Sequence, residues 1–561
     1  MLTASALLLL GVGIAWLFFG HQKIPNPDFA EFRRIGESVA AFELPTRARQ
    51  GPLLGLTQVV LGKILGEEWT ALEAGWLLNA ILYPACILLT WLLLRRPLGW
   101  FAAPVCLLSF LNPWMVQTLV QPLAELPLQF LTLACLVLAV KRNKSCLILA
   151  ALAGLVRWDG LALIPLCAIA LLPSVSKPRA ALLAIVASLP TGAWAGWCWH
   201  IAQTEGAPSY LEDVDPAARA ESGAARFLVR KTETIVLAPL SGAKETTRSD
   251  DRREIRLLTR GLAVLLAGIG VAAAIRHRQR AFLLASLFYI PYAVFLTTYW
   301  IIPRYVSAFV WPLMALMAYG LISVLSGSWL RRAWVRGGSR VLLWTSLALL
   351  AWWGDSLLGA VSRVGSVSPP AVWVPILAAS ALLLIALDRL RNRQARPRSS
   401  PFSALEARIA TIALCVTLVG SNQLLLARVL GDGHFQHEFR KLGSWLAAED
   451  PESVTLVTRM PKVVSLFAPR HEENVVGLKT LECSNVEEVF ASSTTRGFTH
   501  VALWGGSGTS GHPNTFSTQG NESLVRDPGA IGPWRLLQRF ENLPHLSFVE
   551  LWERTDAVGD G

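Results

Sequence analysis

The amino-acid sequence predicts a polytopic α-helical membrane protein of about 13 transmembrane helices with a small C-terminal α/β domain outside the membrane. Apolar residues make up 53% of the 561-residue chain, and its mean hydropathy is +0.45. Charged residues make up only 16%, whereas soluble proteins carry about 25%. These values exclude a soluble multidomain protein and a disordered chain. Eight cysteines are too sparse for a disulfide scaffold.

The predicted spans are apolar stretches, because about 20 apolar residues can cross a bilayer. They lie at about residues 3–19, 73–94, 97–112, 122–140, 145–157, 159–173, 180–200, 257–275, 281–300, 306–325, 341–360, 371–387 and 409–427. The region 145–173 is either two short spans that meet at Arg157-Trp158-Asp159 or one long broken span. The first stretch lacks a small-residue cleavage site, so we interpret it as an uncleaved span.

The net charge of +12 is distributed unevenly along the chain. Residues 431–561 contain 11 Lys and Arg against 17 Asp and Glu, so the positive excess belongs to the membrane region. That excess lies in short clusters, as in cytoplasmic loops: Arg95-Arg96, Lys141 to Lys144, Arg276 to Arg280, Arg331 to Arg340 and Arg389 to Arg398. If the N-terminus lies in the cytoplasm, every one of these basic clusters falls on the cytoplasmic side of the membrane. We therefore predict a multi-pass protein of the cell (inner) membrane with the bilayer as a partner, and no recognition motif supports nucleic-acid binding.

This orientation places two long loops outside the membrane, at about residues 20–72 and 201–256. The first loop contains two predicted helices that can lie in the membrane interface. One has apolar residues at helical spacing from Phe29 to Phe42. The other begins at Pro52, with Gly51 before it as a breaker, and extends to Leu65.

Residues 1–430 form the predicted transmembrane domain and residues 431–561 the predicted extracytoplasmic α/β domain. In the second domain we expect helices at 434–448 and 486–490, and strands at 454–457, 500–504, 534–540 and 547–552. His434 and His437 are three residues apart on the first helix and could share a metal. Spacing places no third ligand, so we predict no metal site.

Two carboxylates are candidates for chemistry at the outer membrane face. Asp28 follows the first span, where it could act as a general base or bind a cation. It could equally be a helix N-cap, because Glu31 completes an Asp-x-x-Glu pattern. Glu125 lies near the outer end of the fourth predicted span. A carboxylate there is costly unless it is paired or faces a cavity.

The arginines of the outer face form the second group of candidates. Arg304 lies in a tight turn between two spans, where its guanidinium suits a phosphate or anchors the chain at the interface. Arg157 could face a phosphate or form a structural ion pair with Asp159. Arg47 and Arg49 precede the second interfacial helix and could also be a solvated basic turn.

Together these positions resemble the GT-C glycosyltransferases, such as protein O-mannosyltransferases and lipid A aminoarabinose transferases. The matching features are an acidic residue after the first span, a basic-Pro segment, an acidic residue at the fourth span, a Gly-Leu-x-Arg stretch, an Arg-Tyr turn and a soluble outer domain. In this chain they correspond to Asp28, Arg47 to Leu53, Glu125, Ala153 to Leu161, Pro303-Arg304-Tyr305 and residues 431–561.

The resemblance implies a GT-C-like fold and sugar transfer from a polyprenyl-phosphate-linked donor to an unknown acceptor on the extracytoplasmic face. It implies catalytic roles for Asp28 and Glu125, with Asp28 deprotonating the acceptor. It implies substrate-binding roles, toward the lipid phosphate above all, for Arg304, Tyr305, Arg157 and Arg47. The first outer loop carries a single Asp rather than an acidic pair, so neither a metal nor a cofactor is expected.

Two other functions remain open at this point. A transporter or flippase of lipid-linked saccharides would use the same arginines on phosphate without needing a base, and such proteins often contain internal repeats and broken helices. A non-catalytic scaffold would only present the acidic outer domain. The long outer loop with interfacial helices, together with the lack of a convincing repeat, favours the enzyme.

Overall fold

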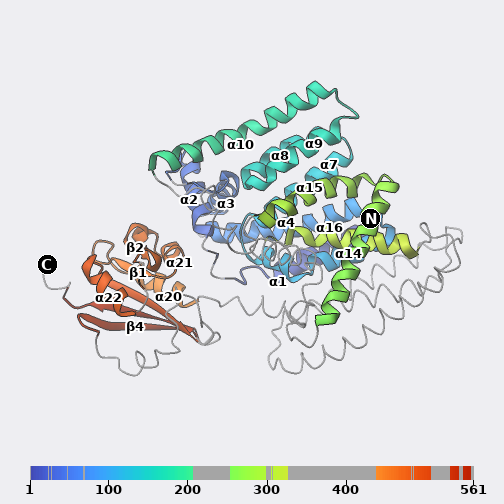
Figure 1. The fold of residues 1–561 in the computed structure, drawn as a ribbon. Helices are drawn as coiled ribbons and strands as arrows, with labels where there is room; N and C mark the ends of the chain where they lie inside the picture. Colours follow the sequence, from blue (N-terminus) through green and yellow to red (C-terminus); the bar gives the residue numbers. More distant parts are fainter. Residues whose placement is uncertain are drawn as a thin grey trace. The chain divides into compact units, whose positions relative to one another are not determined.

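The structure is a computed structural model that describes most of the chain, namely residues 2–22, 25–26, 28–46, 48–66, 70–205, 253–298, 305, 307–325, 437–481, 483, 486–506, 531–542 and 547–556. Two compact units make up the chain. The helical unit contains Met1–Gly20 and Phe32–Leu430, and the second unit contains His21–Glu31 and Gly431–Gly561. Figure 1 shows the helices of the first unit and the mixed α/β structure of the second.

The described helices of the first unit follow the predicted apolar stretches. They are α1 (Leu2–Leu17), α2 (Asp28–Ala40, shared with the second unit), α3 (Pro52–Leu65), α4 (Ala71–Leu94), α5 (Ala102–Phe110), α6 (Pro113–Val120), α7 (Glu125–Val140), α8 (Cys146–Val156), α9 (Leu163–Leu171), α10 (Lys177–Glu205), α14 (Arg253–Arg276), α15 (Arg280–Thr298) and α16 (Ser307–Leu325). Short 3-10 turns lie at Gly99–Phe101 (η1) and Trp158–Ala162 (η2). Both predicted interfacial helices are present as α2 and α3, and α3 begins at Pro52 as expected.

Within the described residues, α4 and the first 28 residues of α10 are long and apolar enough to cross a membrane. A third span results if α5 and α6, which are bent by 59°, count as one. The other apolar helical stretches described have 10–17 residues, and the predicted spans at 341–360, 371–387 and 409–427 lie outside the described residues. The predicted number of about 13 spans is therefore not established.

Two details of the helical unit differ from the predicted spans or decide between them. The predicted span at 97–112 contains α5 and ends where Pro113 opens α6, which lies outside the predicted spans. The Asn112 side chain caps α6 by accepting from the Trp114 amide at 3.0 Å. At 145–173 the chain forms two short helices rather than one. Gly160 turns back onto the Ala153 carbonyl, where a β-carbon would lie 2.3 Å away.

The segment before α3 is held against the turn between α8 and α9. The indole of Trp158 donates to the Arg49 carbonyl oxygen at 3.0 Å. On α10, Trp194 donates to the carbonyl oxygen of Gln50 and Trp197 to that of Pro45, at 2.9 and 3.2 Å. These bonds satisfy backbone groups that no helix or strand satisfies. They fix the chain that leads into α3 beside Arg157.

The second unit is built on a five-stranded sheet in the order β2-β1-β3-β5-β4. Its strands are β1 (Leu456–Thr458), β2 (Val475–Gly477), β3 (His500–Gly506), β4 (Trp534–Asn542) and β5 (Ser547–Arg554), and its helices are α20 (His437–Leu446), α21 (Pro461–Phe467) and α22 (Val486–Thr495). Strands β2, β1 and β3 run parallel, while β5 and β4 are antiparallel. The predicted elements of this unit are present, and β2 and α21 were not predicted.

The sheet of the second unit separates two hydrophobic cores, because successive residues of a strand point to opposite faces. On one face, Leu456 and Ala502 pack with residues of α20 and α21. On the other face, Val457 and Val501 pack with residues of α22. The His437–Leu446 helix buries its apolar stripe, including Leu442 and Leu446, against the sheet.

Candidate functional site

A charged cluster inside the helical unit forms around Arg157, which ends α8 in an extended backbone conformation. Its Nη1 lies 3.2 Å from Oε1 of Glu125, the first residue of α7. Its Nη2 lies 2.9 Å from Oδ2 of Asp159, which belongs to η2. Only 14%, 9% and 8% of the Arg157, Glu125 and Asp159 side chains are exposed. The fold thus joins three charged groups from three elements in one buried place.

Two tyrosines complete the surroundings of this cluster. The Arg157 guanidinium carbon lies 4.4 Å from the ring centroid of Tyr305, an arrangement that favours the cation. The hydroxyl of Tyr292 on α15 donates to Oδ2 of Asp159 at 3.2 Å. The guanidinium is therefore held in its plane by two carboxylates and covered on one face by a ring.

These residues line a narrow cavity between α7, α15 and the start of α16. Its wall consists of Glu125, Leu128, Gln129, Thr132, Arg157, Phe288, Tyr289, Tyr292, Tyr305, Ser307 and Ala308. The cavity has room for about one water molecule. Gln129 is 5% exposed, and its Nε2 has no hydrogen-bond partner among the residues that the structure describes. This amide is thus a donor available to a ligand in the cavity.

The charges of the cluster limit what it can bind. One guanidinium and two carboxylates leave one net negative charge, which by itself disfavours a phosphate. Each carboxylate can accept a hydrogen bond or a proton, and Arg157 has five N–H donors of which two point to the carboxylates. The arrangement can orient a hydroxyl-rich ligand, and it needs a further cation to hold a phosphate.

The predicted site residues have different outcomes. Glu125, Arg157 and Tyr305 are brought together, and the ion pair considered for Arg157 and Asp159 is present. Arg304 and Arg47 lie outside the described residues.

Asp28 begins α2 in the segment that groups with the second unit. Its backbone amide donates to Oδ1 of Asn26 at 3.0 Å. The Asp-x-x-Glu pattern does begin a helix, with Asp28 and Glu31 in its first turn. The catalytic role that the resemblance implies for Asp28 stays a prediction.

Three polar residues of the cavity, Gln129, Tyr289 and Tyr292, did not stand out in the sequence. A signal for the tyrosines existed, because the chain has only seven tyrosines and three of them line this cavity. Tyr289 accepts a hydrogen bond at 3.0 Å from the indole of Trp311, which is 2% exposed. Rare hydroxyl-bearing rings within an apolar stretch thus mark the polar wall of a helical unit.

Comparison with known proteins assigns the fold. No family model and no curated protein matches the sequence. Among solved structures, the fold is similar to that of ArnT from Cupriavidus metallidurans bound to undecaprenyl phosphate, with 14% sequence identity and a TM-score of 0.51 over 98% of both chains. The apo structure of that ArnT is also similar, with 14% identity and a TM-score of 0.48 over 99% of both chains.

The chain therefore has a GT-C-like fold, as its sequence motifs predict. Within that class, the solved protein that it resembles is ArnT, a lipid A aminoarabinose transferase. At 14% identity this likeness concerns the fold, and the activity is treated below.

Proposed function

We propose that this protein is a membrane glycosyltransferase that transfers a sugar from a polyprenyl-phosphate-linked donor to an acceptor on the extracytoplasmic face. The observation that carries the proposal is the cavity around Arg157, where a guanidinium, two carboxylates and two tyrosines meet. It lies in a chain with an ArnT-like fold, and the ArnT from Cupriavidus metallidurans has been solved bound to undecaprenyl phosphate. Transfer of a sugar from a lipid-phosphate donor would explain both the polar cavity and the ArnT-like fold.

In the proposed reaction an acceptor oxygen attacks the anomeric carbon of the sugar. The bond between that carbon and the donor phosphate oxygen breaks, and the polyprenyl phosphate leaves with the electron pair. Asp28 takes the acceptor proton as general base. Arg304 and Arg47 supply the positive charge that the phosphate needs as it leaves. Neither a metal nor a cofactor takes part.

The Arg157 cluster positions the donor in this proposal. Glu125 and Asp159 fix the plane of the guanidinium, so its remaining N–H groups point in set directions. Tyr305 covers one face of the guanidinium. In this proposal its ring also contacts the donor. Because both carboxylates already pair with its charge, Arg157 orients the donor more than it attracts the donor's phosphate.

The proposal is tested with the full-length protein in lipid nanodiscs. The substrates are a panel of undecaprenyl-phosphate-linked hexoses and pentoses with cell-envelope extract as acceptor, and the release of undecaprenyl phosphate is measured. Asp28→Asn is expected to lower release at least about 100-fold while donor binding is kept. Arg157→Lys is expected to lower kcat by about tenfold or more, because an ammonium cannot bond both carboxylates in one plane.

The matched control for the loss of a carboxylate on α2 is Glu37→Gln. Glu37 is 55% exposed, and its carboxylate lies 3.5 Å from Nε of Arg33, one turn earlier in the same helix. Glu37→Gln should release undecaprenyl phosphate at the wild-type rate. Full activity of Asp28→Asn, or no release from any donor, would contradict sugar transfer. Movement of the labelled donor across the membrane that persists in Asp28→Asn without release would identify a flippase instead.

A further inference from the structure

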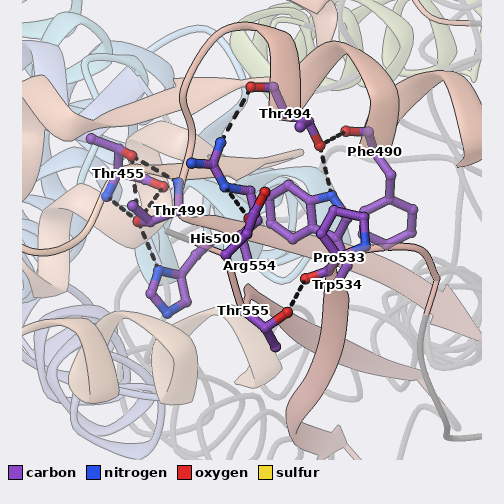
Figure 2. Close-up of polar contacts among 10 residues, drawn as sticks. Thr455, Phe490, Thr494, Thr499, His500, Pro533, Trp534, Arg554 and Thr555 are labelled. Carbon is purple, nitrogen blue, oxygen red and sulfur yellow. Dashed lines mark hydrogen bonds and ion pairs between the residues drawn. The ribbon is translucent and has the colours of Figure 1, made fainter. Parts of the chain in front are cut away.

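The two ends of the parallel strands in the sheet of the second unit differ in the hydrogen bonds that their polar groups make. At the edge where the parallel strands begin, hydrogen bonds link the side chains and backbone of neighbouring elements, as Figure 2 shows for Thr455, Thr494, Thr499, His500, Pro533, Trp534, Arg554 and Thr555. The Arg554 Nη1 donates to the Thr494 carbonyl oxygen at 3.2 Å. Many polar groups at this end are thus satisfied by the protein's own bonds, although Nε of Arg554 and Oγ of Ser493 are buried without a hydrogen-bond partner among the described residues.

At the opposite edge, where β1 ends, polar groups are left without partners. Thr458, the last residue of β1, is 0% exposed, and its Oγ1 has no hydrogen-bond partner in the described part of the chain. The next residue is Arg459, whose Nη1 is buried and also without a hydrogen-bond partner among the described residues. Most buried polar groups in proteins have a hydrogen-bond partner, which can be protein, water or a ligand.

Arg459 is fixed in place despite its unused donor. Its guanidinium carbon lies 4.4 Å from the ring centroid of Trp504 on β3. The indole of Trp504 donates to Oε1 of Glu438 at 2.6 Å, which fixes the ring. Burial lowers the pKa of Arg459, because desolvation disfavours the charged guanidinium.

Thr458 and Arg459 lie on the same face of the sheet. Thr458 follows Leu456 by two residues, so both point to the face covered by α20 and α21. The guanidinium of Arg459 lies over the ring of Trp504, which packs against that same core. The unused hydroxyl and the unused N–H therefore belong to consecutive residues at the end of β1. The carboxyl ends of parallel strands are where α/β sheets bind ligands.

A second cationic side chain, that of Lys462, lies three residues after Arg459. Lys462, in the first turn of α21, has its Nζ 3.8 Å from Oε2 of Glu31. Glu31 is three residues after Asp28, in the segment that groups with this unit. The side chain of Lys462 is 54% exposed, so it can turn from Glu31 to a ligand. This edge thus lies next to the helix turn that carries the proposed base.

We propose that Thr458, Arg459 and Lys462 form an anion-binding subsite of the outer domain that holds a phosphate group of the acceptor. The subsite would anchor the acceptor while its hydroxyl reaches Asp28. The assignment of the anion to the acceptor rests on the proposed sugar transfer, whereas anion binding itself does not. A phosphate matches the unused donors because it accepts hydrogen bonds from a guanidinium and a hydroxyl together.

The test is phosphate binding by the full-length protein in neutral-lipid nanodiscs, without any sugar donor. The probes are inorganic phosphate and, in a separate arm, nanodiscs with phosphatidic acid. Arg459→Gln is expected to weaken binding of phosphate about tenfold or more. Thr458→Val, which keeps the shape and removes the hydroxyl, is expected to weaken it about threefold to tenfold. The matched control Arg535→Gln removes an exposed arginine from β4 and should change affinity less than about twofold.

The outcomes separate the two proposals. Loss of phosphate binding in Arg459→Gln and Thr458→Val, but not in Arg535→Gln, supports the subsite even if no sugar transfer is found. A stronger response to phosphatidic acid than to free phosphate identifies a lipid acceptor, and the reverse identifies a soluble phosphorylated one. No phosphate binding by the wild type, or equal loss in all three variants, overturns the subsite. If Arg459→Gln fails to fold, Thr458→Val decides.

Discussion

His500 begins β3 with its imidazole almost fully buried, at 7% exposure. Its Nδ1 shares a hydrogen bond of 2.9 Å with the Thr499 hydroxyl (Figure 2), and its ring lies 5.5 Å from that of Trp445. Burial lowers the pKa of His500 below 6.5, and nearby Glu553 offsets part of this effect. The folded protein therefore binds this proton less readily than the unfolded chain.

This shift predicts a pH dependence of stability. Below about pH 6.5 the unfolded chain is protonated at His500 and the folded protein is not, so stability falls as the pH is lowered toward the folded pKa. The slope contributed by this group is at most about 1.4 kcal/mol per pH unit. His500→Asn should flatten it, as measured by thermal unfolding of the full-length protein between about pH 5 and 7.5. An unchanged slope in the variant would contradict the assignment.

At the scale of residues, the sequence predicted which charged groups matter better than what they contact. Arg157 and Glu125 stand out because charges are costly within apolar stretches. Their separation of 32 residues gives no sign that they pair, and the pair depends on how α7 packs against α8. Gln129 and Tyr292 were missed because uncharged polar residues are common in membrane helices and carry a weaker signal.

At the scale of elements, α2 and α3 cross at glycines. A β-carbon on Gly55 of α3 would lie 1.8 Å from the Phe32 carbonyl oxygen, and one on Gly36 of α2 would lie 2.2 Å from the carbonyl carbon of Gly55. The helices approach as closely as their backbones allow. Small residues at such crossings are typical of helices in membranes.

Gly55→Ala is therefore expected to push α2 away from α3 and to destabilise the protein by about 1–3 kcal/mol. The measurement is the thermal unfolding midpoint of the full-length variant. Gly192→Ala on α10 is the control, since its β-carbon would meet nothing within 4 Å and alanine favours a helix. It should keep or raise the midpoint. Equal midpoints for Gly55→Ala and the wild type would contradict the close crossing.

The helix boundaries show where local signals suffice. Pro52 after Gly51 predicted the first residue of α3, and a capping box of Thr70 and Glu73 opens α4. The predicted span that ends at residue 112 agrees with the break at Asn112, where Asn-Pro is a local stop signal, whereas the short helix α6 after it was not predicted. Short β2 was missed because three residues carry no period, and only pairing with β1 defines it.

At the scale of the whole molecule, the ArnT-like fold and the proposed donor predict stabilisation by a lipid phosphate. Binding to the folded state alone stabilises by about 2.7 kcal/mol at a ligand concentration of 100 Kd. Undecaprenyl phosphate should therefore raise the unfolding midpoint of the full-length protein in detergent. Undecaprenol, which has the same chain without the phosphate, should raise it much less. Equal effects of both lipids would contradict phosphate recognition.

The sequence predicted the class of the molecule from quantities that add up along the chain. Hydropathy and the distribution of Lys and Arg indicate a membrane region followed by an acidic domain, and the GT-C-like fold agrees with this organisation. The grouping of His21–Glu31 with residues 431–561 was not predictable, because it depends on contacts such as that of Lys462 with Glu31. Such contacts join residues more than four hundred positions apart.

The two indoles of α10 that donate to backbone carbonyls restrict which insertions and deletions α10 can tolerate. Trp194 and Trp197 are three residues apart and reach the same segment because one helical turn separates them. Each inserted or deleted codon upstream within α10 would rotate both rings by about 100° around the helix axis. Homologous genes that retain both indoles are therefore expected to differ in length within α10 only by whole turns.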